Sequence, residues 1–231
     1  MDRNSNLYTF IFAIIMVIVV AATLAFTATS LKGRQKANVE KEKMQNILST
    51  IGVNVSRDEA GNQFGQYVKE QLALNADGTV NTDVKAFEIE LMKEIKRPNE
   101  EQAYPIYIAE KEGKKFYVVP LFGAGLWKEI WGYLALDSDK NTIIGASFDH
   151  AGETPGLGAE INQGWFEDQY IGKTIFDESN NFVSVNAIKG GSKPGDMHGV
   201  DAISGGTITC DGVNNMIDER LRNYLPYFKN N

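Results

Sequence analysis

The stretch IYIAEKEGKKFYVVPLF, residues 106–122, decides the fold. Its two apolar halves lie on either side of Glu112-Gly113, a pattern that predicts two strands joined by a tight turn. The stretch WGYLALDSDKNTIIGASFD, residues 131–149, repeats the pattern around residues 138–141. The two pairs together predict a mostly antiparallel sheet.

The segments around these strands carry helix, turn and strand signals. The spacing of apolar residues predicts helices at 64–74, 84–95, 164–172 and 213–228. The sequence NADGT, residues 75–79, predicts a turn, and residues 182–188 predict a further strand. The final helix is amphipathic, with Met216, Leu221 and Leu225 on one side. The expected fold class is therefore α+β, a mostly antiparallel sheet with helices packed on it.

The N-terminal segment is strongly apolar. Residues 4–31 contain no charged side chain and centre on FIFAIIMVIVVAATLAF, residues 10–26. About 20 apolar residues span a bilayer core. A cleaved signal peptide, with small residues near the end of the segment as its cleavage site, is the alternative. The length of the apolar segment and its weakly basic start, Arg3 beside Asp2, favour a retained transmembrane anchor over residues 1–31.

Residues 32–50 are expected to continue as a helical connector into a folded domain over residues 51–231. Three cations, Lys32, Arg34 and Lys36, follow the apolar segment, whereas one arginine and the amino terminus precede it. The positive-inside rule would place the large domain in the cytoplasm. Because that rule is weaker for long translocated domains, the flanking charges leave the topology open.

The composition argues against several classes of function. The 231 residues carry a formal net charge of -7. No basic block interleaves with aromatic residues, so we expect no nucleic acid partner. Cys210 is the single cysteine, and the histidines His150 and His198 lie far apart, which disfavours a disulfide and a metal site. No serine or cysteine motif accompanies a histidine, so no catalytic residue is assigned.

Three glycine-containing loops are the candidate sites. GAGLW, residues 123–127, and HAGETPGLG, residues 150–158, each follow a predicted strand, a common place for a binding loop. DAISGGTITCDG, residues 201–212, precedes the last helix, whose N-cap is expected at Thr209 or Asp211. Free N–H groups at a helix N-terminus attract phosphate. Taken alone, each loop is also compatible with a purely structural turn.

Taken together, the anchor, GLW, HAGETPGLG and SGGT before the final helix resemble the C-type subunit of the sodium-translocating NADH:quinone oxidoreductases over nearly the whole chain. The resemblance implies FMN joined through its phosphate to a threonine hydroxyl. The family's attachment pattern is Asp, two free positions, Ser or Thr, Gly, Ala, Thr. It is matched here by Asp201, Ser204, Gly205, Gly206 and Thr207. Glycine at position 206, where alanine is usual, is a departure that loosens the backbone without blocking the site.

The same resemblance implies the roles of individual residues. Thr207 is the expected attachment residue, and Thr209 is the fallback, on the same side if the segment is extended. The flavin ring is expected to lie against Leu126, Trp127 and Leu157. The other expected cofactor-binding residues are Glu153, Thr154, Gly156, Gly158, Lys189, Ser204, Gly205 and Gly206. A separate flavin transferase, which uses FAD and a magnesium ion, is expected to recognise Asp201, Ser204, Gly205 and Thr207.

The resemblance further implies a single-pass protein of the cytoplasmic (inner) membrane whose soluble domain faces the periplasm, against the flanking charges. Its partners would be the other subunits of the sodium-pumping reductase, within which it relays electrons and has no activity alone. One alternative is the G-type subunit of the Rnf electron-transport complex, whose usual glycine-rich stretch lacks the tryptophan of GLW. Another, of a different class, is a flavin-free membrane adaptor whose loops bind a partner.

Overall fold

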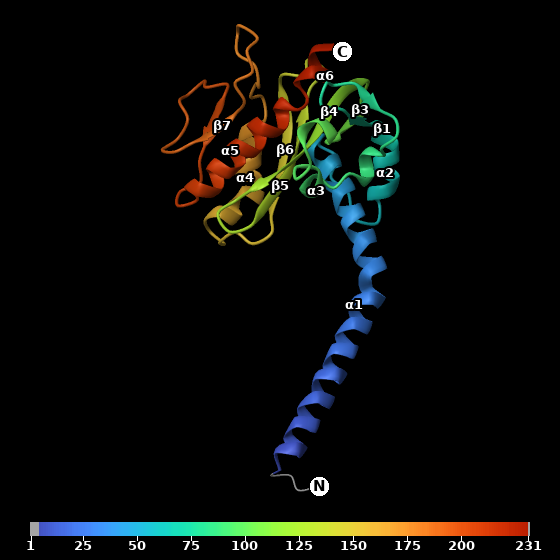
Figure 1. Ribbon diagram of the computed structural model, residues 1–231. Coiled ribbons are helices and arrows are strands. Elements are labelled where there is room, and N and C mark those ends of the chain that lie inside the picture. The colour runs from blue at the N-terminus through green and yellow to red at the C-terminus, as the bar shows by residue number, and fades with distance from the viewer. Residues whose placement is uncertain (1–4, 231) are drawn as a thin grey trace. The chain divides into compact units, whose positions relative to one another are not determined.

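The computed structural model describes residues 5–230 and contains a six-stranded antiparallel sheet with the order β2-β1-β3-β4-β5-β6 (Figure 1). Its strands are β1 (Val68–Leu74), β2 (Val80–Asn81), β3 (Tyr104–Lys111), β4 (Lys114–Ala124), β5 (Glu129–Leu136) and β6 (Ile143–His150). A short parallel pair is formed by β7 (Asn186–Ile188) and β8 (Gly199–Asp201). The α-helices are α1 (Asn6–Thr50), α2 (Ala60–Tyr67), α3 (Leu91–Glu94), α4 (Gly164–Glu167), α5 (Thr207–Arg222) and α6 (Leu225–Asn230). The predicted α+β class is confirmed.

Both predicted hairpins are confirmed. β3 and β4 are joined by two residues, Glu112 and Gly113, whose φ angles of 55° and 76° suit a tight two-residue hairpin turn. In the turn between β5 and β6, the Asp139 carboxylate accepts the N–H groups of Asn141 and Thr142, each at 2.8 Å. The predicted turn at 75–79 and the predicted short helix within 164–172 are present as well.

The predicted helix at 64–74 is wrong in its second half. α2 ends at Tyr67 and the chain continues as β1, in which Leu72 is opposite Ile106 and Leu74 is opposite Tyr104 of β3. Most of β3 is buried, and without β1 one of its edges would expose unpaired backbone N–H and C=O groups. Pairing with a buried strand therefore overrides the local helical spacing.

Two further predicted elements are shorter than expected. Residues 84–95 form only a 3-10 turn, η1 (Ala86–Glu88), and the single turn α3, because Glu90 between them is extended (φ −101°, ψ 99°). The strand predicted at 182–188 is reduced to β7, because Ser184 adopts a left-handed φ of 62°. Other 3-10 turns are η2 (Asn99–Glu101), η3 (Gly158–Asn162) and η4 (Asp168–Tyr170).

The last long helix, α5, begins at Thr207, six residues before the predicted start. The predicted N-cap, Thr209 or Asp211, is wrong. The N-cap is Gly206, whose carbonyl accepts the N–H of Cys210 at 2.9 Å. Gly205, with φ of +76°, turns the chain into the helix. The polar stretch TITCDG thus becomes the first turns of the helix because Thr209, Cys210 and Gly212 find buried positions against the sheet.

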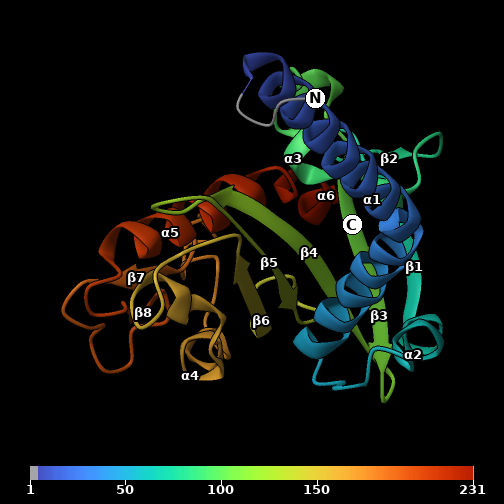
Figure 2. The same cartoon turned by 90° about the horizontal axis from the view of Figure 1, so that it is seen from below.

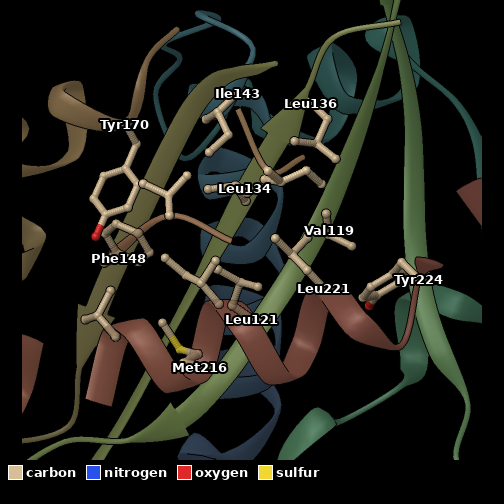
Figure 3. Close-up of a cluster of buried hydrophobic side chains, with 14 of the residues drawn as sticks. Val119, Leu121, Leu134, Leu136, Ile143, Phe148, Tyr170, Met216, Leu221 and Tyr224 are labelled. Atoms are coloured by element: carbon tan, nitrogen blue, oxygen red, sulfur yellow. The ribbon is translucent and has the colours of Figure 1, made fainter. Parts of the chain in front are cut away.

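The sheet has a separate apolar cluster on each face. The first lies between the sheet and α5, and joins Leu121 and Leu134 to Met216 and Leu221 (Figure 3). The second contains the alternate residues of the same strands, such as Tyr107, Val118 and Tyr133, together with Ile47 and Leu48 of α1. Because successive side chains of a strand point to opposite faces, the two clusters share strands but no side chains. Figure 2 shows α2 beside β1 at one edge of the sheet, and α4, β7 and β8 beyond β6 at the other.

The long helix α1 belongs to two compact units, one ending at Lys43 and the other beginning at Met44. The second unit includes the end of α1 because Ile47 and Leu48 are fully buried. The first contains an apolar segment long enough to cross a membrane, with its side chains exposed. Its threonine hydroxyls donate within the helix, as when Thr23 and Thr27 donate to carbonyls four residues earlier at 2.8 and 2.9 Å. Asp2 and Arg3 lie outside the described residues.

Candidate functional site

Three loops that are far apart in the sequence meet at the N-terminal end of α5 and line a cavity of about 200 Å³. The lining residues are Leu126 from the β4–β5 loop, Glu153, Thr154, Leu157 and Gly158 from the segment after β6, and Gly205, Gly206, Thr207, Ile208 and Thr209 at the start of α5. Most of the residues selected from the sequence therefore share one cavity.

The β4–β5 loop presents apolar side chains to solvent. The N–H of Gly125 donates to the carbonyl of Lys128 at 2.8 Å and closes a tight turn. Leu126 and Trp127, at its tip, are 44% and 67% exposed. The indole Nε1 of Trp127 donates to Thr154 Oγ1 at 3.2 Å, which ties this loop to the next one. Trp127 is thus a surface residue beside the cavity and does not belong to the core.

Glu153 joins all three loops. Its side chain is buried, and its Oε1 accepts the N–H groups of Trp127 at 2.9 Å and Lys128 at 3.4 Å. Its Oε2 accepts the hydroxyl of Thr209 at 2.7 Å. Burial by itself would raise the pKa of this carboxyl, but the hydrogen bonds from Trp127, Thr209 and Lys128 outweigh it and hold the pKa below the ordinary value. Glu153 is therefore an ionised carboxylate inside the protein.

Glycines make room for this carboxylate. A Cβ on Gly125 would come within 2.6 Å of Glu153 Oε1. A Cβ on Gly158 would overlap Thr209 Oγ1 and would lie 2.8 Å from Glu153 Oε2. These two positions therefore require glycine because of a close approach, and their glycines explain part of the GAGLW and ETPGLG motifs.

The first turn of α5 is open toward the cavity. The N–H groups of Thr207, Ile208 and Thr209 have no acceptor in the described part of the chain, and no side chain caps the helix. Free N–H groups and the positive end of the helix dipole favour an anion at this position. α5 has 16 residues, long enough for a substantial dipole.

The two threonines of this turn differ in their surroundings. Thr209 is 1% exposed and its hydroxyl is engaged by Glu153. Thr207 is half-buried, lines the cavity, and its hydroxyl has no hydrogen-bond partner among residues 5–230. The two threonines were expected to lie on the same side if the segment were extended; the segment is helical, so that condition is not met and residues two apart point in different directions.

Some predicted residues lie outside the cavity lining. Gly156 forms a turn at φ of +75°, and Ser204 is exposed beside the start of the helix. Lys189 is exposed on the loop between β7 and β8 and does not line the cavity. Asp201 accepts both the N–H (2.7 Å) and the hydroxyl (3.2 Å) of Ser192, so it fastens that loop to the segment that leads into α5.

Ile208 was missed by the sequence reasoning. It lines the cavity and is 58% exposed, although it is an isoleucine in the first turn of a helix. An apolar residue directly after the candidate threonine could have indicated this position, but only once the helix was known to begin at Thr207. With Leu126, Trp127 and Leu157, which is 40% exposed, it forms an apolar rim around the cavity.

Comparison with known proteins finds a family match over the part of the chain that lines the cavity. Residues 125–222 match the family of the FMN-binding domain. The C-type subunit of the Na(+)-translocating NADH-quinone reductase of Vibrio anguillarum is 30% identical over 94% of this chain and 91% of its own length. The corresponding subunit of Pseudomonas aeruginosa is 28% identical over 94% and 91% of the two chains.

Two solved structures share the fold. The crystal structure of the C-type subunit of Parabacteroides distasonis superposes with a TM-score of 0.79 and 43% sequence identity, over 86% of this chain and 96% of that one. The crystal structure of Shewanella oneidensis NqrC superposes with a TM-score of 0.73 and 29% identity, over 83% and 97%.

Proposed function

The chain belongs to the family of the C-type subunits of the Na(+)-translocating NADH-quinone reductases, and we propose that it relays electrons through an FMN joined covalently to Thr207. Its membership in this family, predicted from the motifs, is confirmed, and it is a subunit of an oxidoreductase complex with an FMN-binding domain. The relatives support this family over the G-type subunit of the Rnf complex. The covalent bond, the membrane topology and the role of each residue are proposals.

The observation that carries the proposal is the Thr207 hydroxyl, which has no hydrogen-bond partner among the described residues. It lies at a helix N-terminus whose first three N–H groups have no acceptor within residues 5–230, beside a cavity lined by glycines and apolar side chains. A phosphoester at this oxygen would place the phosphate charge next to those N–H groups, where it is stabilised. Thr209 does not suit attachment, because it is buried and donates to Glu153.

The residues of this chain fit a flavin in the remaining space. Three glycines, Gly158, Gly205 and Gly206, leave the cavity wall without side chains next to Thr207, which suits a ribityl chain. The exposed side chains of Leu126, Trp127, Leu157 and Ile208 provide an apolar surface that would keep water from one part of a flat ring. When bound, FMN supplies one-electron and two-electron redox chemistry, and the protein positions it and sets its electrostatic surroundings.

We propose that a flavin transferase recognises Asp201, Ser204, Gly205 and Thr207. Ser204 and Gly205 are exposed, so an enzyme has access to them. The Asp201 carboxylate accepts the N–H of Ser192, so Asp201 also fastens the loop between β7 and β8.

The membrane proposal depends on α1. We propose that residues 1–31 form a single-pass anchor in the cytoplasmic membrane, that 32–50 form a helical connector, and that the domain from 51 onward faces the periplasm. The apolar, exposed surface of the helix and the internally bonded hydroxyls support the anchor. The cations after the span argue for the opposite side, so the topology needs a direct test, for instance by reporter fusions at the C-terminus.

The covalent bond is tested in the full chain co-produced with its transferase. We expect denatured protein to be fluorescent in a gel, with one FMN per chain located on Thr207 by mass spectrometry of peptides. Thr207→Ala should abolish the adduct completely, while Thr209→Val should retain it, because Thr209 is engaged elsewhere. A colourless wild-type protein under these conditions would favour the flavin-free adaptor, and an adduct that persists in Thr207→Ala would move the bond to another residue.

A further inference from the structure

Glu153 is the one ionisable residue among those that line the cavity in the described part of the chain. Its carboxylate is already committed, since Oε1 accepts two backbone N–H groups of the Trp127 loop and Oε2 accepts the Thr209 hydroxyl. The expectation that Glu153 supplies polar contacts to the flavin stays a prediction, and the structure adds that its carboxylate has partners within the protein. It connects the β4–β5 loop to the first turn of α5, the two elements that carry Trp127 and Thr207.

From this arrangement we propose that Glu153 is a positioning residue with an electrostatic effect: it fixes the Trp127 loop relative to Thr207 and lowers the reduction potential of the flavin bound between them. The proposal rests on the proposed function, because it assumes a flavin in this cavity. It assigns to Glu153 a role that is separate from direct contact with the ring.

The positioning part follows from the contacts on both sides. The β4–β5 loop is closed by its own hydrogen bond, from Gly125 to Lys128. Two contacts attach it to the rest of the site: the hydrogen bonds to Glu153, and the hydrogen bond of Trp127 with Thr154. Thr154 is exposed, so the latter contact competes with water and is weak. The buried carboxylate with three donors is the stronger connection.

The electrostatic part follows from burial and ionisation. A carboxylate with several donors stays charged inside the protein, which agrees with the lowered pKa of Glu153. In a partly dehydrated site, a fixed negative charge is poorly screened. Adding an electron to a neighbouring group is then less favourable, so the potential falls. Removal of the charge at constant shape should raise it.

The test uses Glu153→Gln in the full chain with its covalent flavin. The amide is the same size, and its oxygen can still accept the N–H of Trp127, while the Thr209 hydroxyl can accept from the amide nitrogen. We expect the flavin to remain attached and its one-electron reduction to become easier by about tenfold, equivalent to about 59 mV in the midpoint potential. Glu160→Gln is the matched control: this residue bonds the N–H of Gly156 at 3.1 Å in the same loop but does not line the cavity. It should leave the potential unchanged.

A second measurement does not need the flavin. In the flavin-free Thr207→Ala background, amide hydrogen exchange of Trp127 and Lys128 should be at least tenfold faster with Glu153→Ala than with Glu153 intact, while exchange in β3 and β4 stays the same. Because this measurement is made without flavin, it tests the positioning role even if Glu153→Gln does not fold with the flavin bound. Thermal unfolding identifies the variants that are folded.

The outcomes are separable. If the wild-type protein carries no flavin, the proposed function fails, while faster loop exchange in Glu153→Ala would still support the positioning role. A wild-type potential in correctly folded, fully flavinylated Glu153→Gln would overturn the electrostatic role. Unchanged exchange of Trp127 and Lys128 in Glu153→Ala would overturn the positioning role.

Discussion

Each face of the sheet packs against one end of a helix, and the two helix ends differ in whether their backbone polar groups have partners. On one face, the C-terminus of α1 is closed: the carbonyls of Leu48 and Ser49 accept N–H groups of residues 51–53, and just beyond the helix Lys111 Nζ donates to the carbonyls of residues 51 and 52 at 3.0 and 3.1 Å. On the other face, the N-terminus of α5 is open: in the part of the chain that the structure describes, no side chain caps it and its first N–H groups have no acceptor. A glycine allows each helix to approach the sheet closely. Gly145 of β6 lies against Thr50 at the end of α1, and Gly212 of α5 lies against Ala124 of β4.

This difference separates a structural joint from a binding site. The α1 terminus has its polar groups satisfied by the protein and its large apolar side chains, Ile47 and Leu48, fully buried. The α5 terminus combines N–H groups that have no acceptor among residues 5–230 with exposed apolar side chains, of which Trp127 and Ile208 are 67% and 58% exposed. Leaving both kinds of group unpartnered is unfavourable in a purely structural element, so a ligand explains them together.

The largest expected effect on stability comes from adding a side chain at the two glycines where these helices approach the sheet. In Gly145→Ala and in Gly212→Ala, the new Cβ would overlap a backbone carbonyl oxygen, of Thr50 and Ala124 respectively. Each should lower the free energy of unfolding by about 3 kcal/mol, because backbone cannot move aside as a flexible side chain does. Urea unfolding of the detergent-purified chain measures this loss.

Flavin content distinguishes the two variants. Gly212→Ala should also reduce covalent flavin, because it pushes α5 away from the loop that carries Leu126, whereas Gly145→Ala should flavinylate normally at temperatures where it is folded. Equal flavin content in the two variants would show that the α5 contact does not shape the site.

A second comparison concerns two carboxylates that follow β6. Glu153 has three donors and a lowered pKa, whereas Glu167 has the single N–H of Phe148 at 2.6 Å. Burial, which the Phe148 bond only partly offsets, together with the neighbouring Asp168 and Asp149, raises the pKa of Glu167 to about 7. Three donors keep Glu153 charged against its burial, whereas in Glu167 one donor is outweighed by burial and two acidic neighbours.

Glu167 makes a pH prediction with a definite sign. Because its folded-state pKa is above the ordinary 4.5, folding binds a proton; the resulting stability is complete below about pH 4.5 and is lost as the pH rises through about 7. We expect a loss of roughly 2 kcal/mol between pH 5 and pH 8, allowing for partial exposure. In Glu167→Gln this contribution should disappear, while Glu178→Gln, at an exposed position, should retain the wild-type slope. Urea unfolding at several pH values measures it, and identical slopes in both variants would exclude Glu167 as the group.

The central hairpins were predictable because their signals are local, whereas the three site loops were recognisable only together, through their resemblance to a known family. Short, continuous apolar runs on either side of the Glu112-Gly113 turn define β3 and β4 without help from distant residues. β1 was not predictable, because residues 68–74 become a strand only when β3 offers its edge. The early start of α5 was hidden for a similar reason: threonines have low intrinsic helix propensity, and Thr209 is helical here because Glu153, fifty-six positions earlier, accepts its hydroxyl.

The smallest expected effect concerns the departure from the family's attachment pattern at Gly206. This residue has φ of −99°, which alanine adopts without strain, and a new Cβ would lie 3.1 Å from Ile203 Cβ and Cγ2. The crowding is slight, and the loss of unfolded-state freedom offsets it, so Gly206→Ala should change the free energy of unfolding by less than about 0.5 kcal/mol and should flavinylate fully. Gly205→Ala is the matched comparison, because φ is +76° there and a Cβ would lie 2.7 Å from Leu157 Cδ2. It should lose about 1–2 kcal/mol and much of the flavin. If thermal unfolding and in-gel fluorescence showed the two alanines to be equivalent, the open end of α5 would not depend on the left-handed turn that precedes it.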